Sequence, residues 1–155
     1  MTDVAIRSAC PDEAGKLTDI AFRSKASHGY DLAFMEACRK ELTVSLADFA
    51  RRLLWIAEDG NGRLLGFAGL WPVENGVAEV DPVYVDPPYK GMGVGQALWA
   101  QLESQARLDG AKKLGLDSDP HAVGFYSRMG CRVVGEAPSG SIPGRMLPRM
   151  EKALA

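Results

Sequence analysis

Hydrophobic residues in the first third of the chain recur mainly at helical spacing. The predicted elements are, in chain order, a strand over Thr2–Ser8, a helix that starts at Pro11, and further helices over Asp31–Lys40 and Leu46–Arg52. Pro11 suits the first position of a helix, and the acids Asp12 and Glu13 suit the positive end of its dipole. Its apolar stripe consists of Leu17, Ile20, Ala21 and Phe22.

From Leu54 onward the pattern changes to that of strands. Two strands, Leu54–Ala57 and Leu64–Trp71, flank Asn61-Gly62, a strong signal for a tight hairpin turn. A third strand is predicted over Val77–Val85. The remaining predicted elements are a helix over Val94–Leu108, a strand over Leu114–Leu116, a helix over Asp119–Met129, and strands over Arg132–Gly135 and Arg145–Met150. This order predicts a single mixed α/β domain, residues 1–155, around one sheet.

Composition and charge narrow the class of protein. Of 155 residues, 46% are hydrophobic and 25% are charged, the balance of an ordinary globular domain. A net charge of −2 offers no basic surplus for nucleic acid. The N-terminus lacks the apolar core of a signal peptide, and the longest uncharged apolar run, Leu64–Val73, is about half the length of a membrane span. We therefore expect a cytoplasmic protein that binds neither nucleic acid nor a membrane.

Metal binding is not expected either. The three cysteines lie far apart in the sequence without a metal-ligand pattern, and only two histidines are available. Buried reduced thiols are the simplest interpretation of the cysteines.

The clearest chemical signal is the glycine-rich turn Lys90–Gly95, between the strand that ends at Val85 and the helix that begins at Val94. Free backbone N–H groups at a helix N-terminus bind anions, and glycines let the backbone approach the ligand closely. A phosphate or pyrophosphate is the natural ligand. The G-x-G-x-G spacing differs from a Walker loop and from a dinucleotide fingerprint. Taken alone, the segment could also be a loop that merely turns the chain.

Two motifs give the chain a specific resemblance. Val85-Asp86-Pro87, Lys90-Gly91-Met92-Gly93-Val94-Gly95 and Ala97-Leu98 resemble the acetyl-coenzyme A signature of the GCN5-related N-acetyltransferases, with Lys90 where the family has Gln or Arg. Asp119-Pro120-His121-Ala122, Phe125-Tyr126 and Met129-Gly130-Cys131 are similar to the family's second motif, with Asp119 in place of Asn and Cys131 in place of Phe. The resemblance covers Leu53 to about Leu154.

The resemblance implies a mixed, mostly antiparallel central sheet of about six or seven strands flanked by helices. Residues 1–52 would form the acceptor side and residues 53–155 the cofactor-binding core. It implies acetyl-CoA as co-substrate, no metal, and direct transfer of the acetyl group to a primary amine of a small molecule or peptide. The cofactor-binding residues that it implies are Val83, Tyr84, Val85, Lys90, Gly91, Met92, Gly93, Val94, Gly95, Gln96, Asp119, Phe125, Tyr126 and Arg128. Asp119 is also a good helix N-cap.

Three residues are implied to act on the reacting atoms. The backbone N–H of Val85 would stabilise the developing oxyanion, and Tyr126 would donate a proton or hydrogen bond to the departing thiolate. An alkylammonium, with a pKa of about 10.4, must lose a proton before it attacks, so a carboxylate is expected nearby. Glu79 sits where many family members place this base. Asp81 is the second candidate and shares a strand face with Glu79 if the strand alternates regularly; a solvated strand edge is the alternative.

The acceptor site is predicted from Tyr30, Asp81 and Arg145. Tyr30 and Arg145 lie in segments that the family uses as walls of the acceptor cleft. The acidic strand suggests a cationic acceptor, whereas Arg23 and Arg145 could equally bind an acceptor carboxylate. The sequence leaves a homodimer open, and it leaves two alternative functions, a non-catalytic acyl-CoA sensor and a nucleotide-binding module.

Overall fold

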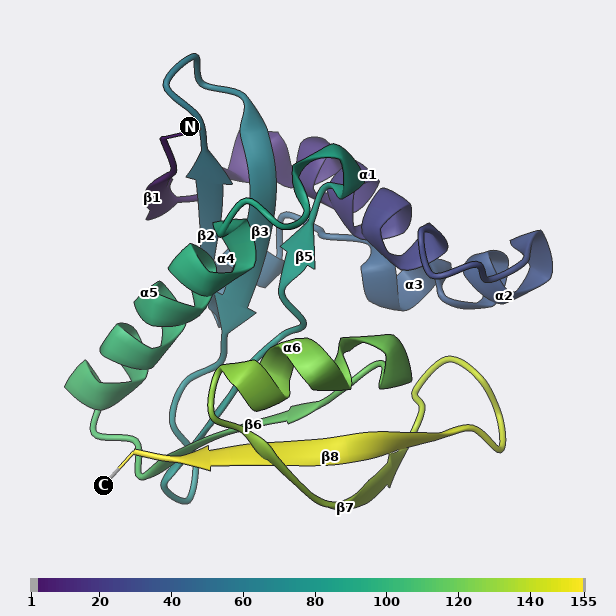
Figure 1. Ribbon diagram of the computed structural model, residues 1–155, viewed down its shortest axis with the longest axis vertical. Helices are drawn as coiled ribbons and strands as arrows, with labels where there is room; N and C mark the ends of the chain where they lie inside the picture. The colour runs from purple at the N-terminus through teal and green to yellow at the C-terminus, as the bar shows by residue number, and fades with distance from the viewer. Residues whose placement is uncertain (1–2, 155) are drawn as a thin grey trace.

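The computed structural model describes residues 3–154, which form two four-stranded sheets with helices packed against them (Figure 1). The strands are β1 (Ala5–Ser8), β2 (Leu53–Glu58), β3 (Leu64–Leu70), β4 (Val77–Glu79), β5 (Tyr84–Val85), β6 (Lys113–Asp117), β7 (Arg132–Pro138) and β8 (Met146–Ala153). The helices are α1 (Ala14–Ala26), α2 (Leu32–Ala37), α3 (Arg39–Leu42), α4 (Asp48–Arg51), α5 (Val94–Leu108) and α6 (Val123–Arg128). Short 3₁₀ turns cover Pro11–Glu13, Pro87–Tyr89 and Pro120–Ala122.

The first sheet has the strand order β1-β2-β3-β5 and is antiparallel throughout. Its central strands β2 and β3 are buried on both faces, which accounts for their nearly continuous apolar sequences. One face packs on Leu17 and Ile20 of α1, and the other packs on Leu98 and Leu102 of α5. The predicted hairpin between β2 and β3 is confirmed, with Gly62 at a φ of 78° in its turn.

The second sheet has the order β4-β6-β8-β7, in which only the β4–β6 pair is parallel. Leu114, Leu116 and Met150 are buried in one core with residues of α5 and with Tyr126 of α6. In Figure 1, α6 lies between this lower sheet and the end of β5. The C-terminal half of the chain thus brings α6 to the place where the two sheets meet.

The predicted single strand Val77–Val85 is wrong, because the chain changes sheet in the middle of this segment. β4 pairs with β6, whereas β5 pairs with β3. At the crossover, the Val80 N–H donates to Gly115 of β6 and the Asp81 N–H to Gly69 of β3, and Pro82 has no N–H to continue either ladder. The sheets therefore part between β5 and β6.

The expected fold class is confirmed as mixed and mostly antiparallel, although its eight strands form two sheets rather than one sheet of six or seven. The predicted helix over Asp31–Lys40 is two short helices, α2 and α3, separated at Cys38. Thr2, the first residue of the first predicted strand, lies outside the described residues. Within residues 3–154, no helix combines the length and the apolar character needed to cross a membrane.

Candidate active site

The glycine-rich turn leaves the N-terminus of α5 open. Gly93 is the N-cap with a φ of 80°, and Gly91 has a φ of 79°, so both adopt the left-handed conformation that favours glycine. Among residues 3–154 no side chain caps the helix, and no atom outside the adjacent residues lies within 4 Å of where a Cβ on either glycine would be. This 15-residue helix therefore directs free backbone N–H groups into open space, as an anion site requires.

A cavity of about 410 Å³ lies at this end of α5, and we call it the turn cavity. All the predicted cofactor-binding residues line it except Tyr84, Met92 and Asp119. Tyr84 and Asp119 line a neighbouring cavity, and Met92 is 45% exposed. Gly95 lets α5 approach α6 closely, because a Cβ there would lie 2.8 Å from Cε1 of Phe125.

The backbone of β5 presents N–H groups toward this cavity. Asp86 donates its N–H to the Leu65 carbonyl of β3 at 2.8 Å. Because successive N–H groups of a strand point to opposite sides, those of Val83 and Val85 point away from β3. The Val83 N–H indeed donates to the hydroxyl oxygen of Tyr126 at 2.9 Å. Since β5 is the last strand of its sheet, this edge is available to an extended ligand.

Tyr126 occupies the junction between the sheets and is 1% exposed. Burial raises the pKa of its hydroxyl above the ordinary range, so the group stays protonated at neutral pH. Its oxygen accepts the hydrogen bond from Val83, which leaves the hydroxyl proton free to donate to another group. Tyr126 is therefore a proton or hydrogen-bond donor rather than a base.

A second cavity, of about 380 Å³, adjoins the turn cavity, and we call it the acidic cavity. Four carboxylates line it, those of Glu41, Asp81, Asp117 and Asp119, together with the cations Lys25, Arg52 and Arg145. The residues that line both cavities are Ser24, His28, Val83, Ala122 and Tyr126. The Val83–Tyr126 pair thus stands where the two cavities meet.

Asp81 is the predicted base that the structure places at the acidic cavity. Its carboxylate forms an ion pair with Arg52 and accepts a hydrogen bond from Trp71 Nε1 at 2.9 Å. Burial raises the pKa of Asp81, although Arg52 and Trp71 oppose this shift. Gly69 makes room for the pair, because a Cβ there would lie 2.7 Å from Asp81 Oδ2.

Glu79, the other predicted base, lies against a different neighbour. Its carboxylate forms an ion pair with Arg149 of β8 and lines neither the turn cavity nor the acidic cavity. Arg149 reaches it across β6 at Gly115, where a Cβ would collide with the guanidinium. The regular alternation that would place Glu79 and Asp81 on one strand face is lost where the chain changes sheet.

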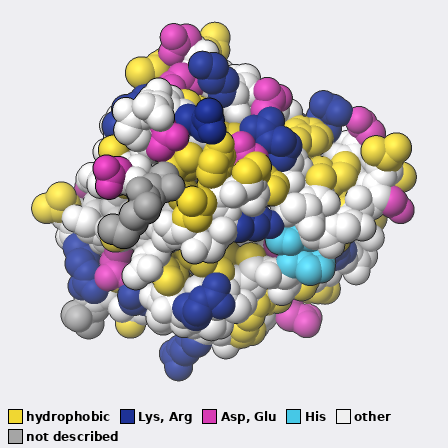
Figure 2. Space-filling view, turned by 45° about the horizontal axis from the view of Figure 1, so that its top comes forward, with side chains coloured by type: hydrophobic (Ala, Val, Ile, Leu, Met, Phe, Trp, Pro, Cys, Tyr) yellow, Lys and Arg dark blue, Asp and Glu magenta, His cyan; other side chains and the backbone are white. Residues whose placement is uncertain are grey.

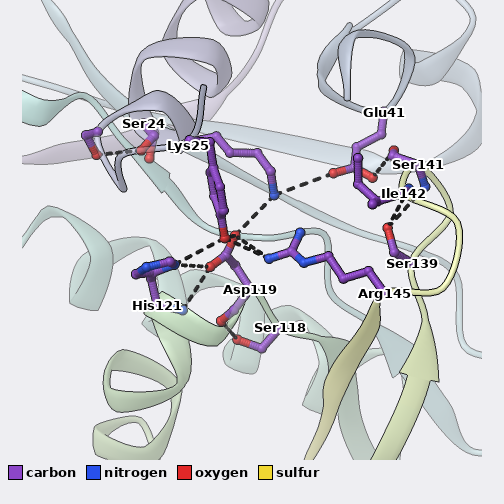
Figure 3. Close-up of polar contacts among 12 residues, drawn as sticks. Ser24, Lys25, Glu41, Ser118, Asp119, His121, Ser139, Ser141, Ile142 and Arg145 are labelled. Carbon is purple, nitrogen blue, oxygen red and sulfur yellow. Dashed lines mark hydrogen bonds and ion pairs between the residues drawn. The ribbon is translucent and has the colours of Figure 1, made fainter. Parts of the chain in front are cut away.

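Asp119 is the centre of a polar cluster that Figure 3 shows in one wall of the acidic cavity. Tyr30 donates its hydroxyl proton to Oδ2 at 2.8 Å, Lys25 Nζ lies 3.2 Å from the same oxygen, and the His121 N–H donates to Oδ1 at 2.8 Å. Burial would raise the pKa of Asp119, but these donors hold it well below its usual range. Burial and the Asp119 carboxylate raise the pKa of Tyr30 to about 12.

The structure joins the predicted acceptor residues Tyr30 and Arg145 directly and keeps Arg23 apart. Arg145 Nη2 donates to the Tyr30 hydroxyl oxygen at 2.7 Å. Arg23 instead forms two hydrogen bonds with Asp86, at 2.8 and 3.0 Å, and lines neither cavity. Of the two arginines considered for an acceptor carboxylate, only Arg145 lines the acidic cavity.

Glu41 and Arg52 line the site and were not predicted, whereas Lys25 and His28 lie in the predicted wall segment that ends at Tyr30 but were not singled out. His28 stacks on His121, with ring centroids 4.8 Å apart, and the two imidazoles lie side by side on the surface in Figure 2. Burial lowers the pKa of His28. Lys25 had a signal in the sequence, because it continues the buried stripe of α1 eight residues after Leu17.

The sequence of the chain is similar to those of known N-acetyltransferases. The family model described as "Acetyltransferase (GNAT) family" matches residues 20–131. A glucosamine 6-phosphate N-acetyltransferase from Trypanosoma brucei brucei is 32% identical over 98 residues, which cover 57% of this chain and 67% of that protein. A peptidyl-lysine N-acetyltransferase from Salmonella typhimurium is 29% identical over 136 residues, which cover 86% of this chain and 87% of that protein.

Solved structures share the fold over nearly the whole chain. A GCN5-related N-acetyltransferase from Rhodopseudomonas palustris has a TM-score of 0.81 at 28% identity and covers 99% of this chain and 98% of its own. The PaiA N-acetyltransferase from Thermoplasma acidophilum, solved in complex with coenzyme A, has a TM-score of 0.78 at 20% identity. The match covers 97% of this chain and 99% of that chain. The family model accounts for most of the chain and confirms the resemblance found in the two motifs. The chain belongs to the GNAT family of acetyltransferases.

Proposed function

We propose that the protein transfers the acetyl group of acetyl-CoA directly to a primary amine while both substrates are bound. The observation that carries this proposal is the meeting of the two cavities at Val83 and Tyr126. One cavity has the open N-terminus of α5 and suits an anionic carrier, whereas the other has the Asp81 carboxylate in its lining, which suits an amine. A thioester at the junction would lie within reach of a nucleophile in the acidic cavity.

The donor would lie in the turn cavity. Its pyrophosphate would accept hydrogen bonds from backbone N–H groups between Gly91 and Gln96, with Lys90 and Arg128 adding positive charge at the rim. Its pantetheine amides would pair with the free edge of β5 around Val83 to Val85, as an added strand does. This edge is free because the chain changes sheet between β4 and β5.

The residues at the junction would stabilise the charges that develop. The amine nitrogen attacks the thioester carbonyl carbon, the C–N bond forms, and the C–S bond breaks with release of a thiolate. The Val85 N–H points away from β3 and would stabilise the carbonyl oxygen as it gains charge. The Tyr126 hydroxyl, whose proton is free, would donate to the thiolate sulfur.

Asp81 would accept a proton from the acceptor ammonium, directly or through water. Its carboxylate lines the acidic cavity, and its raised pKa makes it a better proton acceptor than an ordinary aspartate. Arg52 opposes this rise and favours the ionised form. Glu79 is the less suitable base, because Arg149 holds it outside both cavities.

The acceptor class is a primary amine of a small molecule or a peptide. The two curated relatives are named for glucosamine 6-phosphate and for peptidyl-lysine, which present such amines in very different molecules. The acidic cavity, at about 380 Å³, has room for either a small amine or a single side chain.

The test is release of free thiol from acetyl-CoA with a panel of amines and lysine peptides. Turnover with at least one acceptor is the expected result. Tight binding of acetyl-CoA without thiol release on any acceptor would favour a non-catalytic acyl-CoA sensor. A thermal-shift comparison tests the donor, because acetyl-CoA should stabilise the protein well beyond ATP or NAD. Equal stabilisation by these nucleotides would favour a nucleotide-binding module.

A further inference from the structure

The Asp119 cluster places two cations, the buried Lys25 and the half-buried Arg145, beside one half-buried carboxylate. Lys25 Nζ lies 3.2 Å from Asp119 Oδ2, and Arg145 Nη2 lies 3.7 Å from the same oxygen. The side chains of Lys25, Arg145 and Asp119 are only 9%, 19% and 13% exposed. Charges that are largely shielded from water are stable only when they are well paired. Here two cations face one carboxylate, so this wall of the cavity carries an excess of positive charge.

Asp119 has little capacity left for Arg145. Besides Lys25, its two oxygens receive hydrogen bonds from the Tyr30 hydroxyl and the His121 N–H, and His121 Nδ1 lies 3.0 Å from Oδ1. A carboxylate offers about four lone-pair positions; Lys25, the Tyr30 hydroxyl and the His121 N–H occupy three, and His121 Nδ1 lies beside the fourth. The 3.7 Å approach of Arg145 is accordingly too long for a hydrogen bond.

Arg145 is nevertheless held in one orientation. Its guanidinium lies 4.9 Å from the ring centroid of Phe34 and 5.2 Å from that of Tyr30. Within residues 3–154 its side chain makes one hydrogen bond, to the Tyr30 hydroxyl. The other N–H groups of a guanidinium thus oriented can bind both oxygens of one carboxylate or phosphate.

Glu41, the other carboxylate beside Lys25, offsets the positive charge of the cluster only weakly. Glu41 Oε1 lies 3.7 Å from Lys25 Nζ, but the Glu41 side chain is 38% exposed and its other oxygen accepts a hydrogen bond from Ser141 at 2.6 Å. Water screens a carboxylate at the rim more strongly than one inside the cavity. Asp81, which also lines the cavity, is already paired with Arg52.

We infer that the acceptor carries an anionic group, a carboxylate or a phosphate, in addition to its amine, and that Arg145 and Lys25 bind this group. The inference rests on the proposed function, since it assigns the acidic cavity to the acceptor. The anion is not the pyrophosphate of the donor, because Arg145 and Lys25 line the acidic cavity and not the turn cavity. The acceptor would hold its amine at Asp81, where it loses a proton, and its anionic group at Arg145 and Lys25.

The test uses pairs of acceptors that differ only in the anionic group. Alanine against alaninamide examines the carboxylate, and glucosamine 6-phosphate against glucosamine examines the phosphate. We expect wild-type kcat/KM to favour one anionic member over its neutral partner by about tenfold to a hundredfold, the range of a charge-assisted hydrogen bond. Arg145→Gln should remove this preference by raising KM for the anionic member alone, and Arg145→Lys should restore part of it.

Arg39→Gln is the matched control. Arg39 pairs with Glu36 on the surface, where its side chain is 58% exposed, so the control should keep the preference. Equal use of both members of each pair by the wild type would overturn the inference while the proposed function stands. If Arg145→Gln lowers the rate equally for the anionic and the neutral acceptor of a pair, the inference is also overturned, because a residue with a merely structural role would affect both acceptors alike.

Calorimetric binding of the same four compounds separates this inference from the proposed function. If no compound is acetylated but an anionic one binds more tightly than its neutral partner, and Arg145→Gln abolishes the difference, the anion site stands and the proposed activity fails. If neither turnover nor binding depends on the anionic group, the anion site is excluded.

Discussion

The Val83 N–H donates a hydrogen bond to the Tyr126 hydroxyl oxygen at 2.9 Å and so links the end of the first sheet to the helix that covers the second. This contact satisfies the Val83 amide, fixes the phenol ring, and leaves the phenolic proton free to donate. It stands at the point common to both cavities. Tyr126 is thus positioned by the backbone whose neighbouring amide, that of Val85, would bind the reacting carbonyl.

Tyr126→Phe removes the phenolic proton and keeps the ring. We expect kcat to fall by about a hundredfold, the lower end of the contribution of a general acid, while the Kd for acetyl-CoA changes little. Steady-state kinetics together with calorimetry measure the two quantities. An unchanged kcat would remove Tyr126 from the mechanism.

Gly93→Asp should abolish binding of acetyl-CoA, because it adds a Cβ and a negative charge where the pyrophosphate would lie. We expect at least about a hundredfold increase in Kd, equivalent to about 2.7 kcal/mol. Gly110→Asp is the matched control. Gly110 also has a φ of 80° with no atom within 4 Å of its Cβ position, but it lies at the other end of α5. The two variants should lose similar amounts of stability, and equal losses of affinity would contradict the proposed pyrophosphate site.

Asp81→Asn and Glu79→Gln distinguish the two candidate bases. Asp81→Asn should lower kcat/KM strongly, because an amide cannot accept the ammonium proton, whereas Glu79→Gln should leave it close to wild type.

The rate of the wild type should rise with pH as Asp81 ionises, with a midpoint above that of an ordinary aspartate because burial raises its pKa. Rate profiles between pH 4 and 9 measure this effect. Thermal unfolding of Asp81→Asn checks that loss of the Arg52 ion pair has not unfolded the protein, and a large loss of rate in Glu79→Gln alone would reverse the assignment.

The Glu13 carboxylate should make the free energy of unfolding depend on pH in the acidic range. Its carboxylate accepts hydrogen bonds from Arg7 at 2.8 and 3.0 Å and from the Cys10 N–H at 2.8 Å, and mainly Arg7 lowers its pKa to about 2 from an ordinary 4.5. A pKa lowered by folding stabilises the protein above the ordinary value, and this stabilisation is lost as the pH falls toward the lowered value. Urea unfolding should therefore show a difference between wild type and Glu13→Gln that is full above pH 4.5 and shrinks toward pH 2.

Glu36→Gln serves as the control for that measurement. Glu36 pairs with Arg39 on an exposed helix face, where the Glu36 side chain is 64% exposed. Its replacement should change stability far less than Glu13→Gln above pH 4.5, because exposed ion pairs contribute little. Equal effects of the two substitutions would mean that the Arg7–Glu13 contact is not specifically stabilising.

Features set by neighbouring residues were predictable from the sequence. The hairpin at Asn61-Gly62, the helix Val94–Leu108 and the open turn before it follow from local periodicity and glycine positions, and the structure has all three. The break within Val77–Val85 was not predictable, because it depends on which distant strands, β3 and β6, compete for the same segment. The separation of Glu79 from Asp81 follows from this break.

Charged residues at the site illustrate a second limit. Lys25 continues the apolar stripe of α1, but a lysine in an amphipathic helix is usually solvated, and its burial depends on Asp119, which lies 94 residues later. The pairing of Arg52 with Asp81 likewise depends on Gly69, whose missing side chain leaves space for both. Such contacts become visible only when the strands are placed in register.

The change of sheet between β4 and β5 also bears on the stiffness of the domain. Around this point the two halves share the bridge between Leu70 and Val80 and few other backbone links, so most of the contact between them is side-chain packing in their common core. A donor whose amides fill the gap beside β5 would brace one half against the other. Deuterium uptake at Val85 should then slow when acetyl-CoA is added, whereas uptake at Val83, whose N–H already donates to Tyr126, should change less. The bound donor would also become part of the surface that binds the acceptor.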